Sequence, residues 1–210
     1  FYKKNYSIFD LIISLPGQKK RLIKKIRLNL IGSHNILNSV AAIAVCMHIG
    51  IKINIIKNSL KKFTGIQRRL TKVFELEGRE FFDDYAHHPT EIKSVLKSLK
   101  NSYRKRKIVS VFQPHRYSRL KLLKKDFASS FKNSGLVLLC PVYPAGEKKD
   151  EKYNEIDFAE LIAKNSKVQV ICVENENDLK KFFIKNLIEN ELIVCMGAGS
   201  ISKWIREMKL

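Results

Sequence analysis

The chain has 210 residues, which is enough for one large domain or two small ones. It is 45% hydrophobic and 29% charged, and its many Phe, Tyr, Ile and Leu residues argue against disorder. No apolar run reaches the roughly 18 residues that a membrane-spanning helix needs. The composition therefore predicts a folded globular protein that has no membrane partner.

The charge of the chain is strongly basic, with a formal net value of +20. It is uneven, at +13 over residues 1–70, +9 over 71–149 and −2 over 150–210. Such an excess suits either a nucleic-acid-binding α/β domain or a protein whose lysines are scattered over solvated faces. Because 30 of the 40 basic residues are Lys, without alternating Arg and aromatic residues, we favour the scattered lysines and expect no nucleic-acid partner.

The first third of the chain predicts two strands followed by two helices. Residues 6–15 and 26–31 have strand-like apolar patterns, and a lysine-rich turn after Pro16 and Gly17 separates them. An alanine-rich helix is expected over residues 34–49, and a second over 53–63. The periodicity then stops, so we expect a domain boundary between residues 64 and 65.

The rest of the chain alternates strands with helices after an initial hairpin over residues 70–76 and 79–83. Strands are expected over 107–112, 136–140, 168–173 and 192–196, with a helix after each of the strands that begin at 79, 107, 136, 168 and 192. This alternation predicts an α/β fold, with a Rossmann-like, mostly parallel sheet and helices on both faces. Ligands of such folds bind at the edge formed by the carboxyl ends of the strands.

Polar or small residues follow four of these strands, at the places where this fold binds ligands. The four stretches are Asp83–Pro89, Gln113–Arg119, Pro141–Glu147 and Met196–Ser200. In the first, two carboxylates and two imidazoles would make a poor core, and a carboxylate here suits ribose hydroxyls or Mg²⁺. The alternative is that Asp83 or Asp84 only caps the turn before Pro89. We expect no zinc site, because no third ligand has a recognisable spacing.

The second stretch carries an imidazole and two guanidiniums, from His115, Arg116 and Arg119. Two arginines three residues apart at a helix start can share a face and bind a carboxylate or phosphate through paired hydrogen bonds. The helix N-terminus adds positive potential. The alternative is a solvated basic turn.

Two further features give weaker signals when each is taken alone. Gly197 and Gly199 resemble part of a dinucleotide loop, but they would also suit a tight turn from strand to helix. Asn35 and Asn38 lie three apart on an expected helix, where amides can read an adenine edge or simply cap and solvate the helix.

Taken together, these motifs resemble the Mur ligases of peptidoglycan synthesis. Six stretches in the same order carry the resemblance, namely residues 32–38, 63–70, 83–92, 112–119, 142–147 and 196–199. The resemblance implies that residues 1–64 are the tail of the family's central α/β ATPase domain and that 65–210 are its Rossmann-like C-terminal domain. Within the family, the pattern comes closest to the branch that joins L-alanine to UDP-N-acetylmuramate with ATP and Mg²⁺.

The resemblance also implies roles for ten residues. His34, Asn35 and Asn38 would lie at the adenine, Arg69 at the ATP phosphates, and Asp84 and His87 at the ribose and nucleotide. Tyr85, His115, Arg116 and Arg119 would hold the incoming amino acid. Leu70 departs mildly from the family pattern, which usually has Phe at this position.

The resemblance also sets limits on what these 210 residues can do. They contain no phosphate-binding loop, so we expect no complete catalytic set, most Mg²⁺ ligands to lie elsewhere, and the chain alone to be inactive. The related ligase that attaches murein tripeptide remains an alternative, although residues 115–119 favour alanine. The family's substrates imply a cytoplasmic protein, whereas its oligomeric state stays open.

Overall fold

The computed structural model describes residues 2–3, 6–14, 17 and 19–208. By its contacts the chain divides into two compact units, which we describe separately. The first unit comprises the residues up to Gly65 together with Lys97–Arg104, and the second comprises Ile66–Leu96 and Lys105–Leu210. Assigning the first unit to the tail of an ATPase domain stays a prediction.

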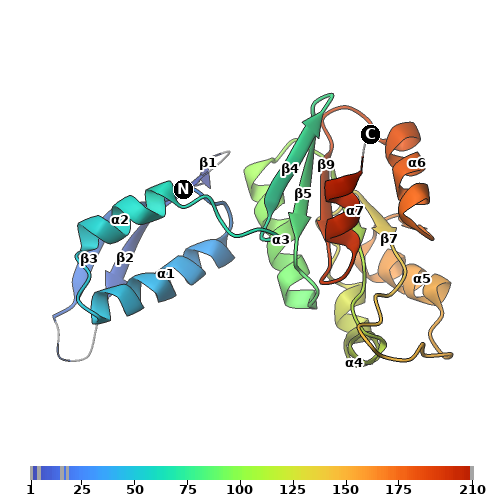
Figure 1. The fold of residues 1–210 in the computed structure, drawn as a ribbon, viewed down its shortest axis with the longest axis horizontal. Coiled ribbons are helices and arrows are strands. Elements are labelled where there is room, and N and C mark those ends of the chain that lie inside the picture. The colour runs from blue at the N-terminus through green and yellow to red at the C-terminus, as the bar shows by residue number, and fades with distance from the viewer. Residues whose placement is uncertain (1, 4–5, 15–16, 18, 209–210) are drawn as a thin grey trace. The chain divides into compact units, whose positions relative to one another are not determined.

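The first unit is a three-stranded antiparallel sheet covered by two helices (Figure 1). Its elements are β1 (Tyr2–Lys3), β2 (Tyr6–Ile13), β3 (Arg21–Leu28), α1 (Ser33–His48) and α2 (Ile53–Lys62). Ile26, Ile43 and Ile56 form its buried core, to which the sheet and both helices contribute one side chain each.

The bounds predicted for the second strand, 26–31, are wrong, because β3 begins at Arg21 and ends at Leu28, which makes the lysine-rich turn before it shorter than predicted. Pro16 of that turn lies outside the described residues. Ile23 pairs with Leu11 of β2 and packs against the core, which holds this stretch in the sheet. A bulge between Phe9 and Leu11 accommodates one additional residue of β3 relative to β2. There the Lys25 backbone N–H donates to Asp10 Oδ1 at 2.7 Å, with Lys25 at a φ of 55°. The lysines of this strand lie on its solvent side, so in the sequence they resemble the lysines of a turn.

The second unit contains a six-stranded sheet in the order β4-β5-β9-β6-β7-β8. Only the β4–β5 pair is antiparallel, so the predicted α/β class with a mostly parallel sheet is confirmed. The strands are β4 (Thr71–Leu76), β5 (Arg79–Asp84), β6 (Ile108–Phe112), β7 (Leu136–Leu139), β8 (Val170–Cys172) and β9 (Leu192–Met196).

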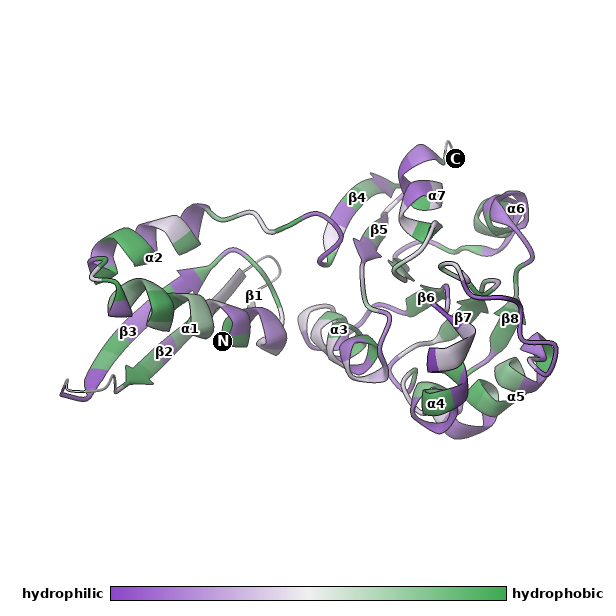
Figure 2. Cartoon of the chain, turned by 60° about the horizontal axis from the view of Figure 1, so that its bottom comes forward, coloured by the Kyte–Doolittle hydropathy of each residue, from purple (hydrophilic) through white to green (hydrophobic). Residues whose placement is uncertain are grey.

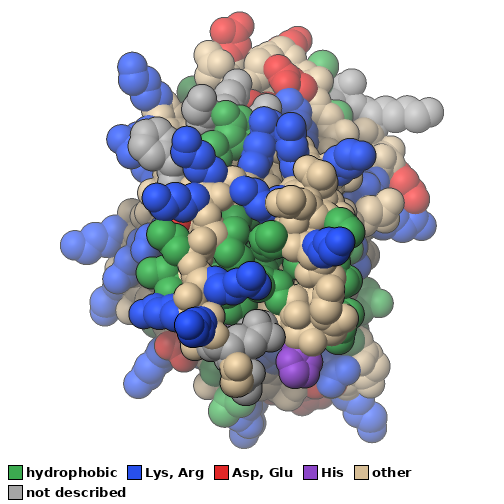
Figure 3. Space-filling model, turned by 90° about the vertical axis from the view of Figure 1, so that its left-hand side faces the viewer, with side chains coloured by type: hydrophobic (Ala, Val, Ile, Leu, Met, Phe, Trp, Pro, Cys, Tyr) green, Lys and Arg blue, Asp and Glu red, His purple; other side chains and the backbone are tan. Residues whose placement is uncertain are grey.

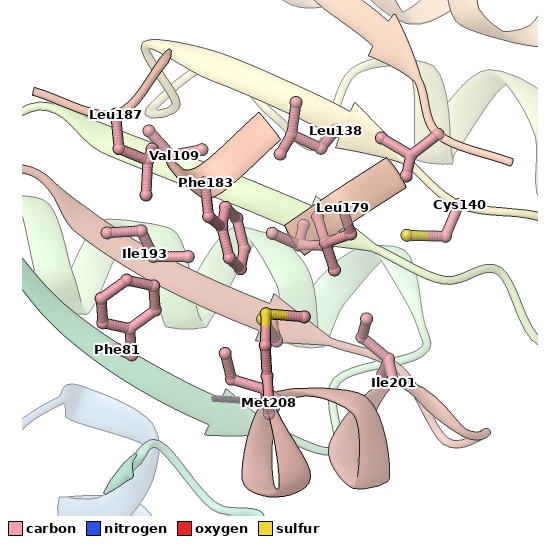
Figure 4. Close-up of a cluster of buried hydrophobic side chains, with 14 of the residues drawn as sticks. Phe81, Val109, Leu138, Cys140, Leu179, Phe183, Leu187, Ile193, Ile201 and Met208 are labelled. Atoms are coloured by element: carbon pink, nitrogen blue, oxygen red, sulfur yellow. The ribbon is translucent and has the colours of Figure 1, made fainter. Parts of the chain in front are cut away.

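Helices cover both faces of this sheet (Figure 2). One face carries α3 (Pro89–Ser102), α4 (Tyr117–Ala128) and α5 (Glu155–Ser166), and the other carries α6 (Glu176–Asn186) and α7 (Ile201–Glu207). Beneath α6 and α7, Phe183 packs edge-on against Phe81 within a cluster of buried apolar side chains (Figure 4). Sheets that are covered on both faces have strands that are buried throughout, as in β6 and β9.

The alternation of side chains along β5 decides which residue faces which layer. Phe81 belongs to the cluster beneath α6 and α7, and Asp83 points to the same face because side chains alternate with a period of two. Phe82 and Asp84 point to the opposite face. Within the described residues, no helix is long and apolar enough to cross a membrane.

Candidate active-site rim

The four polar stretches after the strands meet at one edge of the sheet, as predicted. Their strands, β5, β9, β6 and β7, are consecutive in the sheet and parallel, so their carboxyl ends lie together. The rings of His87 and His115 are 5.8 Å apart between centroids, and His115 stacks on Tyr143 at 5.7 Å. We call this edge the rim and define it as residues 84–88, 113–119, 141–147 and 197–200.

The two adjacent aspartates at the end of β5 have different partners. Asp83 is fully buried and its Oδ2 accepts from Ser202 Oγ at 2.6 Å and from Arg206 Nε at 2.9 Å, both in α7. Asp84 lies at the rim instead, where its two oxygens accept from the backbone N–H groups of Leu70 and Ala86, each at 2.7 Å. Asp83 therefore anchors a helix, and Asp84 is the aspartate of this pair that faces the candidate site.

Burial decides the protonation of Asp84. Desolvation raises the pKa of its carboxyl to about 6, against the opposing effects of the two backbone donors and of Arg69. Each oxygen keeps a further lone pair, so the carboxylate can still accept a ligand hydroxyl. Asp84 thus holds the turn, as the alternative predicted, while its binding of a ribose stays a prediction.

The two histidines after β5 also differ from each other. The exposed His88 precedes Pro89, the first residue of α3, and its Nδ1 accepts from Thr90 N at 3.4 Å. The Glu91 carboxylate accepts hydrogen bonds from the backbone N–H groups of His87 and His88. Glu91 and His88 therefore form a capping box at the start of α3. His87 is partly buried, and its Nδ1 lies 2.9 Å from the Tyr85 carbonyl oxygen. Of the two rings, His87 faces His115 across the rim.

After β6, His115 and Arg119 form a pair. Arg119 Nη1 lies 3.1 Å from His115 Nδ1, and because a guanidinium only donates, Nδ1 is the acceptor. Desolvation and the neighbouring charges of Arg119, His87 and Arg116 lower the pKa of His115. The imidazole is therefore neutral at pH 7 and carries its proton on Nε2.

Arg116 is the residue before α4 and Arg119 lies in its first turn, and their shared grip on a carboxylate stays a prediction. Arg116 has a φ of 71°, a left-handed conformation that is costly for residues other than glycine. Its backbone N–H donates to the Tyr143 carbonyl oxygen at 2.9 Å, which fixes this geometry. The side chain is exposed, so the fold presents one guanidinium to solvent while Arg119 is held against His115.

Glu147 holds the beginning of α4 in place. Its carboxylate accepts from the Ser118 backbone N–H at 3.1 Å and from the Ser118 hydroxyl. These hydrogen bonds lower the pKa of Glu147, so it stays ionised beside the positive end of the helix. The stretch after β7 is thus tied directly to the arginine-bearing stretch after β6.

The stretch after β9 is a tight turn between strand and helix. A Cβ on Gly199 would lie 2.4 Å from Tyr143 Cγ and 2.5 Å from Gln113 Oε1, and one on Gly197 would lie 2.8 Å from the Gln113 carbonyl oxygen. The buried Gln113 side chain accepts from Ile201 N and donates to Ser200 Oγ, each at 3.0 Å. Both glycines are therefore required by close packing within the rim.

Two arginines lie over Tyr85. The guanidinium carbons of Arg68 and Arg69 are 4.6 Å and 5.5 Å from the centre of its ring. Arg68 also donates to the Gly197 carbonyl oxygen at 2.9 Å, and Arg69 is exposed beside Glu91 with an N···O distance of 3.9 Å. Arg69 therefore remains available at the rim, whereas Arg68 holds the turn after β9.

The three residues predicted to contact adenine belong to the first unit. Asn35 is partly buried in α1 and its amide donates to the Ile31 carbonyl oxygen at 2.8 Å, while Asn38 is exposed. His34 is partly buried. The rim belongs to the second unit, so the role of these three at the adenine stays a prediction.

Comparison with known proteins identifies the family to which this arrangement belongs. The profile described as "Mur ligase, glutamate ligase domain" matches residues 68–199, which include the whole rim except Ser200. The chain belongs to the Mur ligase family.

Among curated members, the UDP-N-acetylmuramate–L-alanine ligase of Pelagibacter ubique is 50% identical over 98% of this chain. The ligase of the same name from Rickettsia canadensis is 39% identical over 96%. A crystal structure of the Thermotoga maritima UDP-N-acetylmuramate–alanine ligase has a TM-score of 0.70 at 27% identity, covering 89% of this chain and 41% of its own. The chain spans less than half of the curated relatives that it matches, 44% and 43% of their lengths.

Three residues that hold this Mur ligase rim together were not predicted from the sequence. They are Arg68, Gln113 and Glu147, which belong to the stretches that carry the family resemblance. Their spacing in the sequence does not show that they bind other strand ends rather than ligands. Their partners are 129, 88 and 29 residues away along the chain, at Gly197, Ile201 and Ser118. Only the buried polar character of Gln113 next to a strand gave a usable signal.

Proposed function

We propose that this chain is part of an ATP-dependent ligase that joins L-alanine to UDP-N-acetylmuramate. The identity of 50% with the Pelagibacter ubique ligase over nearly the whole chain carries this proposal. The convergence of the four polar stretches on one rim supports it, because it builds a site for small anionic ligands. These substrates would place the complete protein in the cytoplasm.

In this proposal Arg116 and Arg119 bind the carboxylate of alanine, with His115 and Tyr85 beside it. An arginine fork suits a planar carboxylate, and the neutral His115 adds a donor through Nε2. The cationic surroundings also lower the pKa of the alanine amine, which must be neutral to attack. The amine attacks an acyl phosphate that ATP forms on the muramate carboxylate, and phosphate leaves as the amide bond forms.

The nucleotide would occupy the other side of the rim. Asp84 would accept from the ribose hydroxyls, His87 would lie near the nucleotide, and Arg69 would reach the phosphates. His34, Asn35 and Asn38 would contact the adenine. Most ligands of the Mg²⁺ that the resemblance implies would lie outside this chain.

The experiment uses a hybrid ligase in which these 210 residues replace the matched region of the Pelagibacter ubique protein. We expect phosphate release that requires ATP, UDP-N-acetylmuramate and L-alanine together, and none from the 210-residue chain alone. Release with murein tripeptide but not with alanine would assign the chain to the recycling ligase instead. A stable hybrid that is inactive with both substrates would contradict the proposal.

A lysine at Arg119 tests the amino-acid site. Arg119→Lys keeps the charge but loses the fork, so we expect the Michaelis constant for alanine to rise at least about tenfold while that for ATP hardly changes. Alaninamide lacks the carboxylate, so its Michaelis constant should change little in the variant. If the Michaelis constant for alaninamide rises as much as that for alanine, the arginine binds the acyl phosphate or supports the fold instead.

A further inference from the structure

A cavity of about 120 Å³ lies in the second unit, between α4 and the segment that leads into α5. Side chains of α4 between residues 117 and 124, of residues 150–154 and of Phe158 in α5 line it. Among the residues of the rim, Tyr117 alone contributes to this lining. One water needs a cavity of about 10–15 Å³, so there is room for a group of several non-hydrogen atoms. We call this space the α4–α5 cavity.

Three lysines surround the α4–α5 cavity. Lys121 and Lys124 belong to α4, and Lys152 belongs to the segment before α5. None of the three has an ion-pair partner among the described residues. The lining contains one carboxylate, that of Asp150, whose Oδ1 accepts from the Lys152 backbone N–H at 3.0 Å. Three ammonium groups against one carboxylate leave a net charge of +2, which favours an anionic ligand.

Two tyrosines add uncharged donors to this lining. The rings of Tyr117 and Tyr153 meet edge to face, with their centroids 5.6 Å apart. The hydroxyl oxygen of Tyr153 is buried and has no hydrogen-bond partner in the described part of the chain. Burial raises the pKa of this hydroxyl, so at neutral pH it keeps its proton and can donate. Because buried polar groups nearly always have a partner, a group bound in the cavity that Tyr153 lines would supply the missing one.

Lysine by itself does not mark a site in this protein. Figure 3 shows Lys and Arg side chains spread over one face of the molecule, with few acidic side chains among them. The α4–α5 cavity differs from that background because lysines from two separate segments meet at one hollow. Its lining also includes the buried side chains of Leu120 and Phe158 and a tyrosine whose buried hydroxyl lacks a partner. Charge, shape and an unused donor therefore coincide at one place.

We propose that the α4–α5 cavity binds a phosphate or diphosphate group of a small soluble molecule. Ammonium groups act as point charges that bind a tetrahedral phosphate from several sides, whereas a planar carboxylate suits the guanidinium fork. Lys121, Lys124 and Lys152 would neutralise the phosphate charge, and the Tyr153 hydroxyl would donate to one of its oxygens. The residues proposed for the ATP phosphates and for alanine do not line the cavity, so this is a separate site. The proposal requires no ligase activity.

The test is isothermal titration calorimetry of the 210-residue chain with sodium pyrophosphate at physiological ionic strength, about 0.15 M. We expect saturable binding, and the double variant Lys121→Gln with Lys124→Gln should weaken it at least about tenfold, because two charge-assisted contacts are lost. The matched control is Lys97→Gln with Lys100→Gln in α3, which removes two exposed lysines with the same spacing. The control should change the affinity less than about twofold, because exposed charges are screened by salt.

Tyr153→Phe separates binding from folding. It keeps the ring and removes only the hydroxyl, so the affinity for pyrophosphate should fall at least about fivefold. The melting temperature of the ligand-free chain should not fall, because a buried hydroxyl without a partner does not stabilise the fold. A lower melting temperature with unchanged affinity would assign the hydroxyl to the fold and contradict the proposal.

Three further results would overturn the proposal. The first is the absence of pyrophosphate binding by the unsubstituted chain. The second is a control double variant that binds as weakly as the α4 double variant, because general positive charge would then explain the affinity. The third is binding that Arg69→Gln abolishes and the α4 double variant leaves unchanged, because the anion would then occupy the rim. All these measurements use binding alone, so an inactive hybrid ligase would contradict only the proposed reaction.

Discussion

The two ends of the six-stranded sheet use charged residues in opposite ways. At the amino ends of the strands, Glu80 pairs with Arg106 and Lys72, and Glu191 pairs with Lys107 at 3.0 Å. At the carboxyl ends, Arg69 and Arg116 are exposed to solvent. At the amino ends these charges are paired within the protein, whereas at the carboxyl ends one pair, the buried Asp83 with Arg206, accompanies two arginines that are exposed to solvent.

The backbone is held by specific contacts at both ends. At the amino ends Arg106 also donates to three carbonyl oxygens, those of Gly78 at 2.7 Å, Asn190 at 2.8 Å and Glu191 at 2.9 Å. At the carboxyl ends Arg116 holds a left-handed φ of 71°, and Gly197 and Gly199 allow close packing. Positive φ values are found at the amino ends too, at 49° for Glu77 and 63° for Asn190. The difference between the two ends therefore lies in their charges, which are buried in ion pairs at the amino ends and exposed on Arg69 and Arg116 at the carboxyl ends.

The largest effect should come from the stabilising end. Arg106→Met removes the main partner of Glu80, whose side chain is only 7% exposed, and leaves its carboxylate buried. We expect the second unit to lose about 3–5 kcal/mol of unfolding free energy, measured by urea denaturation. Adding Glu80→Gln should recover a substantial part of this loss, because the amide has no charge to bury. A loss below 1 kcal/mol would remove the contrast between the two ends.

Asp84 predicts a pH effect at the rim. Its folded pKa of about 6 lies above the ordinary 3.8 of an unfolded Asp, so the folded state holds the proton more tightly and stability falls as pH rises from 4 to 6. The shift corresponds to about 3 kcal/mol. Asp84→Asn cannot ionise, so this fall should be missing from its unfolding free energy. If wild type and variant show the same pH dependence, the carboxyl is not desolvated as described.

Gly199→Ala tests the close packing of the rim. The added Cβ would meet the ring of Tyr143 and the amide of Gln113 at distances no real Cβ tolerates, so we expect a loss of about 2–3 kcal/mol in thermal unfolding. Tyr143→Gly in the same chain removes both Tyr143 atoms that clash, Cγ and Cβ, and leaves the clash with Gln113. The double variant should therefore lose less than the sum of the single variants, and strict additivity would show that the turn relaxes elsewhere.

The smallest effect on stability should come from the exposed arginine. Arg116→Gly relieves the strain of a side chain on a left-handed backbone. This stabilises the folded state by more than the added conformational freedom of glycine stabilises the unfolded chain. We expect the unfolding free energy to rise by about 0.5–1 kcal/mol. A clear loss would mean that the Arg116 side chain supports the fold, and the contrast between the two ends would then weaken.

The fold was largely predictable because apolar periodicity and strand-end chemistry agree in the second unit. Four strands with polar ends predicted one rim, and the parallel order β5-β9-β6-β7 provides it. The start of β3 was missed because lysines on its solvent side resemble a turn. The conformation of Arg116 was missed because it depends on a hydrogen bond to Tyr143, which is distant in sequence. Local patterns report an element and its burial, whereas contacts between strand ends require the topology.

The most direct test of the rim as a substrate site measures stability and alanine binding on one preparation of the hybrid ligase carrying Arg116→Gly. The account predicts a melting temperature equal to or above that of the unsubstituted hybrid, together with a Michaelis constant for alanine raised at least about tenfold, which corresponds to about 1.4 kcal/mol. An unchanged Michaelis constant in a folded protein would contradict the account, because the exposed arginine of the rim would then have no part in binding the amino acid.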